Sequence, residues 1–445
     1  MLQTSGVDST GRQKALPARP IDGLPEGGPY ADVIGGITTF FTMAYIVVVN
    51  PGILASPGTG MPFSGALTAT VLVASSMTLL MGLYAKLPFA VAPGMGLNAF
   101  FAYTIVIQQH VSWQTALGIV FWAGVLFLLV SATRLREAIA TSIPTNLRMA
   151  AAGGIGLLLT LIGLRNAGLI VADPATIVRF GVLDHRAVML LAGLLIAAVL
   201  QQRRNPLAFL ASIFAVTAAG WILGYETPPD RVFSAPDFSS AFLKLDVMGA
   251  LRLALLPAMI SMVFTDLFDS LSTFIGVSIA AGLTELDGRP LNLRRGLIVD
   301  AMATLGAGLA GSSSGTAYVE SIAGIRMGGR TGRASLVTAL CFVPCFFIAP
   351  LVASVPSYAT AAVLVLVGLA MFQMVGTVNF RSIEDSLPAF VTIVLIPLTL
   401  SITQGILWGF LLHALVYAAV GRGREVTGIA WALAVISAGL LMLER

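Results

Sequence analysis

Residues 87–106 read "LPFAVAPGMGLNAFFAYTIV". The stretch is apolar and long enough to cross a bilayer, since about 20 residues of helix span a hydrocarbon core of roughly 30 Å. Pro93 disfavours helix in the residue before it and is itself suited to a helix start, and Gly94 and Gly96 follow directly. We therefore predict an extended segment that ends at Pro93 and a half-helix that resumes near Leu97. At membrane depth such a break is tolerated only where it is buried in protein or lines a cavity.

The composition of the whole chain is that of a membrane protein. Its 445 residues are 57% hydrophobic and 10% charged, whereas soluble domains are about 25% charged. The apolar runs are continuous and do not alternate with polar residues, which favours helices over the strands of an outer-membrane barrel. Residues 1–30 are polar and rich in Gly and Pro, and we predict a disordered cytosolic tail without a cleaved signal peptide. The net charge of +4 reflects topology and does not indicate nucleic-acid binding.

We predict a multi-pass protein of the plasma or inner membrane with a cytoplasmic N-terminus. The positive-inside rule supports this orientation, because few of the 25 Lys and Arg residues fall in the predicted outer loops. Those residues are Arg165, Arg179, Arg186, Arg231 and Lys244. The predicted spans number 14, at 33–55, 64–84, 87–107, 112–132, 143–164, 187–202, 207–225, 250–279, 294–310, 312–325, 334–355, 358–377, 386–402 and 404–421.

The all-α chain is expected to divide into two inverted repeats of seven spans. An odd number of spans makes the second repeat enter the membrane from the opposite side, a layout common in secondary transporters. The predicted boundaries are 31–225 for the first repeat, 226–246 for a connecting loop and 247–421 for the second repeat. Residues 422–445 form a C-terminal hydrophobic segment, and its apolar run 427–443 is either an interfacial helix or a further span.

The tenth span is expected to be broken like the third. Residues 308–325 read "GLAGSSSGTAYVESIAGI", and the polar run of Ser312, Ser313 and Ser314 precedes Gly315, where we predict that a second half-helix begins. Topology places the N-terminal ends of both half-helices near the midplane from opposite sides. Each end offers unpaired N–H groups and about half a positive charge, so a polar site is predicted between them.

Four acidic residues lie well inside the predicted spans, although a carboxylate at a helix centre costs at least about 2.5–3.5 kcal/mol on insertion scales. Asp266 and Asp269, in "VFTDLFDSLSTFIGV" (263–277), are three residues apart and share one helix face. Glu320 lies near the start of the tenth half-helix, and Asn98 occupies the equivalent place in the third. Asp300 belongs either to the same site or to a contact with a neighbouring span.

Cysteine and histidine indicate no metal chemistry. Cys341 and Cys345 are one helical turn apart in an apolar span and are interpreted as packing residues. The three histidines, His110, His185 and His413, are scattered without metal-ligand spacing. We expect no metal and no other cofactor apart from the coupling ion.

Several motifs resemble the azaguanine-type hypoxanthine/guanine permeases, a branch of the nucleobase:cation symporter family. These are "FTDLFDSLSTFIGV", "APGMGLNAFF", "SSSGTAYVESIAGI" and "PAFVTIVLIPLTLSITQGI". The resemblance implies a core domain of spans 1–4 and 8–11 and a gate domain of spans 5–7 and 12–14, which would pair as a homodimer through the gate. It also implies that Asp266, Glu320 and Asn98 bind the base and that Asp269 acts in proton coupling.

The chemistry of the residues agrees with this resemblance. Guanine and hypoxanthine present ring N–H donors, which an acceptor-only carboxylate can bind, whereas adenine presents an acceptor at the neighbouring ring nitrogen. The remaining predicted contacts to the base come from Thr316, Tyr318 and Phe268, with the two rings as stacking surfaces. Burial disfavours the charged form of a carboxylate, so an acid here can bind and release a proton during transport. Sodium is the alternative coupling ion.

Other functions were weighed against purine import. A uracil or xanthine permease would keep the family and change the base. A sulfate or bicarbonate carrier would place an anion between the opposed helix ends, which the surrounding carboxylates oppose. An intramembrane aspartyl protease needs two buried aspartates within Tyr-Asp and Gly-x-Gly-Asp motifs, which do not occur in this sequence. Broken helices in an inverted repeat favour alternating access over a channel.

Overall fold

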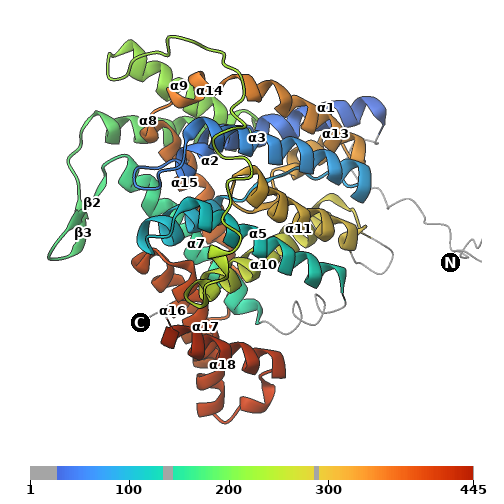
Figure 1. Ribbon diagram of the computed structural model, residues 1–445, viewed down its shortest axis with the longest axis vertical. Helices are drawn as coiled ribbons and strands as arrows, with labels where there is room; N and C mark the ends of the chain where they lie inside the picture. The colour runs from blue at the N-terminus through green and yellow to red at the C-terminus, as the bar shows by residue number, and fades with distance from the viewer. Residues whose placement is uncertain (1–27, 134–143, 285–289, 444–445) are drawn as a thin grey trace, which may run out of the picture.

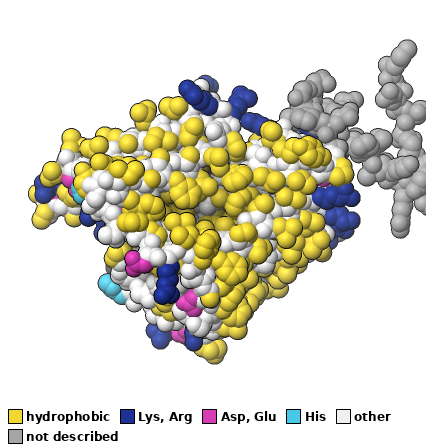
Figure 2. Space-filling view, turned by 90° about the horizontal axis from the view of Figure 1, so that it is seen from above, with side chains coloured by type: hydrophobic (Ala, Val, Ile, Leu, Met, Phe, Trp, Pro, Cys, Tyr) yellow, Lys and Arg dark blue, Asp and Glu magenta, His cyan; other side chains and the backbone are white. Residues whose placement is uncertain are grey.

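The computed structural model describes residues 28–133, 144–284 and 290–443. The predicted cytosolic tail, residues 1–30, lies almost entirely outside the described residues. The described chain is mainly helical, and its helices pack side by side through most of the molecule (Figure 1). Hydrophobic side chains cover much of the face seen in Figure 2, and Lys and Arg gather toward its edges.

The elements of the first repeat follow the predicted spans closely. They are α1 (Pro29–Met43), α2 (Ile46–Leu54), α3 (Phe63–Leu80), β1 (Val91–Pro93), α4 (Met95–Ala99), α5 (Trp113–Ala132), α7 (Thr145–Asn166), β2 (Ile170–Asp173), β3 (Ile177–Phe180), α8 (His185–Gln202) and α9 (Ala208–Ile222). Wider π-helical turns continue α3 to Ala85 and α4 to Gln108. The hairpin of β2 and β3, seen at the left of Figure 1, was not predicted and lies between the fifth and sixth spans.

The second repeat and the C-terminal segment complete the helical bundle. Their elements are α10 (Leu256–Ala281), α11 (Leu293–Ala310), β4 (Gly315–Ala317), α12 (Ser321–Arg326), α13 (Gly332–Phe342), α14 (Ala349–Ala353), α15 (Ser357–Phe372), α16 (Ile383–Thr399), α17 (Ile402–Ala419) and α18 (Gly428–Leu443). Within the described ranges, eight helical segments are long and apolar enough to cross a membrane. The other predicted spans correspond to α9, α11, α16, the segment from α13 to α14 and the two broken segments.

The helices pack in two groups. In one group α1 packs against α12 and α13, α3 against α11 and α13, and α5 against α10 and α11. In the other group α7 packs against α15, α16 and α17, and α8 packs against α9 and α15. The last helix, α18, contacts α17 and α10. At 16 residues it is about 24 Å long, similar to α9 with 15 residues, so its length is compatible with either alternative.

The connecting loop runs along the helices of the first group. Asp237 accepts hydrogen bonds from the hydroxyls of Ser240 at 2.6 Å and Ser64 at 2.7 Å. These bonds hold the pKa of that carboxyl well below its usual range. Asp246 accepts the backbone N–H of Gly249 at 2.9 Å and the hydroxyl of Thr115 at 3.0 Å. The loop is therefore fixed to the starts of α3 and α5.

Candidate functional site

The two broken spans meet in a short antiparallel ribbon. Residues 91–93 of β1 pair with residues 315–317 of β4. The pairing continues past β1, where the N–H of Gly94 donates to the carbonyl of Ser314 at 2.9 Å. All of these residues are buried. Extended backbone at membrane depth must find internal partners, and here each broken span provides them for the other.

Side chains of neighbouring helices satisfy the rest of the extended backbone before α4. The Thr78 hydroxyl donates to the carbonyl of Val91 and accepts its N–H, both at 2.9 Å. The Ser321 hydroxyl accepts the N–H of Ala90 at 3.0 Å. The Ser335 hydroxyl contacts the carbonyls of Leu87 and Phe89 at 2.7 and 2.9 Å. Hydroxyl-bearing residues in apolar helices thus have a structural function, since each replaces a backbone partner.

The two half-helices begin at different distances from the ribbon. Gly94 is the N-cap of α4, which starts at Met95, close to the predicted start near Leu97, and Gly96 lies in its first turn. The predicted start at Gly315 is wrong, because Gly315 belongs to β4 and α12 begins only at Ser321. Pairing with β1 keeps residues 315–317 extended. Glu320 is consequently the N-cap residue of α12.

The run of three serines before β4 connects three different helices. Ser312 accepts a hydrogen bond at 3.3 Å from the amide of Asn50 in α2. Ser313 donates to the carbonyl oxygen of Asn98 in α4. Ser314 donates to Oδ2 of Asp266 in α10 at 2.6 Å. The polar run therefore joins the broken tenth span to the helices that carry the predicted site residues.

Asp266 and Asp300 are both completely buried between α10 and α11. Oδ2 of Asp266 accepts the hydroxyl of Thr304 at 2.5 Å as well as that of Ser314. Oδ2 of Asp300 accepts the hydroxyl of Ser270. Oδ1 of each carboxyl has no hydrogen-bond partner among the described residues. Each acid thus retains one buried oxygen that can accept a further donor or hold a proton.

Asp269 and Glu320 are more accessible, since both are half-buried. Glu320 accepts a hydrogen bond at 2.7 Å from the hydroxyl of Tyr45, at the start of α2. Asp269 has no hydrogen bond to a described residue, and its helix α10 packs against α12, whose N-cap is Glu320. Both acids therefore keep part of their surface outside the packed interior, unlike Asp266 and Asp300.

The other predicted residues divide between the ribbon and a separate aromatic contact. Thr316 is buried in β4 with its hydroxyl 3.3 Å from that of Ser270, and the Tyr318 hydroxyl donates to the carbonyl of Pro93 at 2.5 Å. Phe268 instead stacks on Phe264, with ring centroids 6.1 Å apart, and lies 5.9 Å from the guanidinium of Arg148 in α7. Phe268 thus contacts the second helix group through Arg148.

Sequence reasoning missed several residues that bind the acids or join the hydrogen bonds of Ser312. Tyr45, Asn50, Thr70 and Thr304 lie in apolar helices without a recognisable motif, and only the folded structure brings them to Glu320, Ser312 and Asp266. Burying a polar group without a hydrogen-bond partner is costly, so a polar residue in an apolar helix was itself a sign that it has a buried partner. None of the four intramembrane acids has an ion pair with a described residue. The site is therefore rich in hydrogen-bond acceptors, and none of its acids is compensated by a cation among the described residues.

A ribbon formed by two opposed broken helices, with unpaired carboxylates beside it, is the site of a secondary transporter. The sequence model of the Permease family (Xan_ur_permease) matches residues 31–407. The chain belongs to this family, the nucleobase:cation symporter-2 family, and the resemblance seen in its motifs is confirmed. It is accordingly a transporter of nucleobases and not an enzyme.

Several relatives match nearly their whole length. The putative permease MJ0326 of Methanocaldococcus jannaschii is 41% identical, over 92% of this chain and 93% of its own. The adenine permease AdeP of Escherichia coli K12 is 39% identical, over 89% of each chain. The guanine/hypoxanthine permease PbuO of Bacillus subtilis is 38% identical, over 89% of this chain and 93% of its own.

A solved structure has the same fold with little sequence similarity. The transmembrane domain of the cyanobacterial bicarbonate transporter BicA superposes with a TM-score of 0.65 at 17% identity. The match covers 85% of this chain and 97% of that domain. The predicted all-α architecture of an inverted repeat with two broken spans is thereby confirmed.

Proposed function

We propose that the protein imports purine nucleobases by proton symport through alternating access. One observation carries this proposal: Asp269 and Glu320 are accessible, and neither is paired with a cation. Such a site favours a neutral ligand with several N–H donors, together with a proton. The relatives support a purine, because those named for a substrate include adenine permeases and guanine/hypoxanthine permeases.

The proposed ligands of the base are Glu320 and Asp266, with Asn98 from the opposed half-helix. Glu320 has a second carboxylate oxygen besides the one bound to Tyr45, and Asp266 has an unpaired Oδ1. Hydrogen bonds to a carboxylate contribute about 1.5–3 kcal/mol each. Thr316, Tyr318 and Phe268 are proposed to contact the base after a local rearrangement, because Phe268 and Tyr318 now have other partners.

The site chemistry favours 6-oxopurines over adenine. An ionised carboxylate accepts the ring N–H of hypoxanthine or guanine, but it repels the ring-nitrogen acceptor that adenine presents at the neighbouring position. A protonated carboxyl can donate to that acceptor, so a proton held by the site would make adenine a substrate. The relatives include permeases named for either kind of base.

Asp269 is the proposed proton-coupling residue. It is half-buried and has no hydrogen bond to a described residue, and its helix α10 packs against α12, whose N-cap is Glu320. Like charges in a poorly solvated site resist simultaneous ionisation. A proton at Asp269 would therefore reduce the repulsion among the carboxylates, and between them and the acceptor atoms of the base, when the base binds. Transport then moves the proton and the base together.

The first helix group is proposed to be a moving core and the second a gate. Core spans 1–4 and 8–11 and gate spans 5–7 and 12–14 agree with the packing preferences described above. The N-terminus is placed in the cytoplasm on the distribution of basic residues. A homodimer through the gate is proposed from the family resemblance, and chemical cross-linking in membranes tests it.

Uptake of labelled hypoxanthine tests the function directly. Cells without purine permeases of their own should accumulate the label when they express this protein, and a protonophore should abolish accumulation. Unlabelled guanine, hypoxanthine, adenine, xanthine and uracil then rank the bases by competition.

Asp269→Asn should remove the dependence of uptake on external pH, and unchanged pH dependence would exclude its coupling role. Accumulation that needs sodium and survives the protonophore would replace the proton by sodium.

An anion carrier is the alternative that shares the fold. Sulfate or bicarbonate would have to bind beside Asp269 and Glu320, which have no compensating cation among the described residues. Uptake of labelled sulfate and bicarbonate by the same cells provides the comparison. We expect neither to exceed that of cells with an empty vector.

A further inference from the structure

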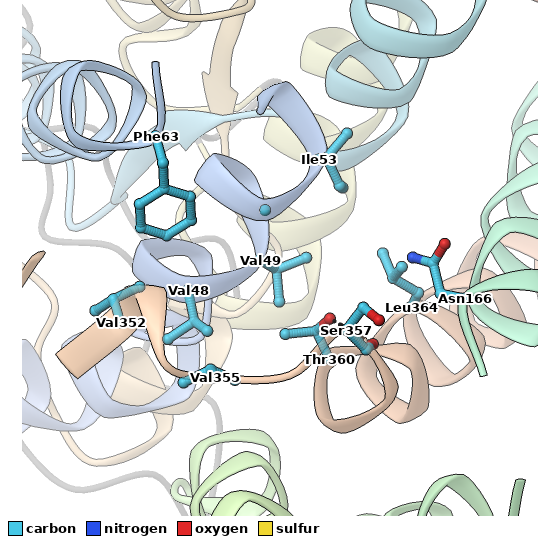
Figure 3. A pocket seen from close by; sticks show the side chains of 11 residues that line it. Val48, Val49, Ile53, Phe63, Asn166, Val352, Val355, Ser357, Thr360 and Leu364 are labelled. Atoms are coloured by element: carbon cyan, nitrogen blue, oxygen red, sulfur yellow. Dashed lines mark hydrogen bonds between the residues drawn. The ribbon is translucent and has the colours of Figure 1, made fainter. Parts of the chain in front are cut away.

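A cavity of about 180 Å³ lies between α2 and the ends of α7 and α15. Figure 3 shows Val48, Val49 and Ile53 on α2 across from Ser357 and Thr360 on α15, with Asn166 of α7 at one end. In the proposed topology this is the outer half of the membrane. None of the intramembrane acids lines the cavity, so it is distinct from the site at the ribbon.

The cavity nevertheless lies on the same face of α2 as Tyr45, which binds Glu320. Tyr45 donates to Glu320, and Val48, Val49 and Gly52 follow it by three, four and seven residues. These spacings place all four on one helix face. With a rise of 1.5 Å per residue, the cavity begins about 5 Å from Tyr45 and extends to about 10 Å. A ligand moving along this face would pass from the cavity to Glu320.

The walls of the cavity differ in chemistry. The α2 wall is apolar, and the opposite wall carries the amide of Asn166 and the hydroxyls of Ser357 and Thr360. Thr360 donates to the carbonyl of Ser357 at 2.9 Å, which leaves its oxygen free to accept. An amide offers both a donor and an acceptor. No Lys, Arg, Asp or Glu lines the cavity, so it favours a neutral ligand with apolar faces and a polar edge.

Gly52 leaves room in this cavity for a ligand. A Cβ added to this residue would meet nothing within 4 Å, although Gly52 lies inside the helix α2. Pockets for drug-sized ligands measure about 300–1,000 Å³, and the smaller volume here suits one flat bicyclic molecule. Gly52 lines the cavity and is exposed, so a larger side chain at this position would occupy open space at the cavity wall.

We propose that this cavity is a second, outer subsite for a purine base, which the base occupies before it reaches Glu320. This inference rests on the proposed function and extends it. Asn166 and Thr360 select the base there through its polar edge, while Val48 and Val49 pack against a ring face. Selection would therefore occur twice, first by neutral groups carried by gate helices and then by the carboxylates.

Filling the cavity tests the role of the subsite in transport. Gly52→Val should raise the KM for hypoxanthine uptake at least about tenfold without lowering the thermal stability of the purified protein, because its added atoms meet only open space. Gly439→Val in α18 is the matched control, since Gly439 is also helical with no atom within 4 Å of an added Cβ. Thr360→Val should change the ratio of KM values for hypoxanthine and adenine while kcat is unchanged. Unchanged KM in both Gly52→Val and Thr360→Val would overturn the proposal.

Binding can also be followed without transport. Thr360→Cys in a background of Cys341→Ala and Cys345→Ala gives a single cysteine in the cavity for a maleimide. Hypoxanthine should protect this cysteine even when Glu320→Ala has removed the inner site. Loss of protection in that variant would refute an independent subsite. If the wild-type protein takes up no purine, the proposed import fails, and protection still decides whether the cavity binds a base.

Discussion

The two broken spans both contain a short extended strand, but they differ in the polarity of their side chains. β1 and α4 are apolar, and Asn98 is their one predicted ligand. β4 and α12 follow three serines and carry Thr316 and Glu320. The ribbon needs both strands equally, since each satisfies the other's backbone. The difference indicates that the third span mainly supports the site, whereas the tenth span supplies most of its polar groups.

Replacing the equivalent polar residue in each span gives the largest expected contrast. Glu320→Gln should reduce the apparent affinity for hypoxanthine about 10- to 100-fold, because it removes the charge from hydrogen bonds that contribute about 1.5–3 kcal/mol each. Asn98→Ala should reduce affinity less and stability more, because it leaves the buried Ser313 hydroxyl without its acceptor. Concentration series of uptake and thermal melts of the purified variants measure both. An equal loss of affinity in the two variants would contradict the division of roles.

A single methyl group tests the ribbon itself. A Cβ at Gly94 would lie 2.8 Å from Cγ2 of Thr316, so Gly94→Ala should destabilise the protein by about 1–3 kcal/mol through overpacking and lower the uptake rate. Thr316→Ser removes that methyl and should restore most of the loss in the double variant. Thr316→Ser alone serves as the control and should resemble the wild type. Failure of the rescue would mean that the close contact is not the cause.

Alanine substitutions of the serines before β4 should destabilise the protein to different extents. Ser314 donates to the carboxylate of Asp266, whereas Ser312 accepts a longer bond from the neutral Asn50. Ser314→Ala should therefore lower the free energy of unfolding by about 1.5–3 kcal/mol, and Ser312→Ala by about 0.5–1.5 kcal/mol. Thermal melts in detergent give the order. The reverse order would indicate that Asp266 is protonated and weakly bound to Ser314 in the folded protein.

The smallest effect is expected in the connecting loop, which lies outside both broken spans. Hydroxyls of Ser240 and Ser64 lower the pKa of Asp237, so its stabilisation is present above the unfolded pKa of about 3.9 and is lost as pH falls through the lower folded value. Asp237→Asn should melt at a lower temperature than the wild type at neutral pH, and the gap should shrink at acidic pH. The KM for uptake should be unchanged. A gap that is constant with pH would exclude this carboxylate as its cause.

The sequence predicted features that depend on local chemistry. Pro93 and the glycines after it predicted the end of β1 and a restart near Leu97, two residues after the observed start at Met95, and the rarity of intramembrane acids made Asp266 and Glu320 candidates for the site. The start of α12 was missed because residues 315–317 are held extended by β1, a contact that no local pattern encodes. The partners of the acids were missed for the same reason, since Tyr45 and Thr304 come from other helices.

The ribbon also has a consequence for biosynthesis. Pro93 and the Tyr318 hydroxyl that binds its carbonyl are 225 residues apart. At roughly 5–20 residues per second, about 10–45 seconds pass between the synthesis of the two strands. Throughout that interval the extended backbone of the third span lacks the partners that β4, Ser321 and Ser335 supply, and only Thr78 of its own repeat binds it. The first half of the chain must therefore wait in a sheltered or hydrated state, and insertion of the second half completes the folding of both.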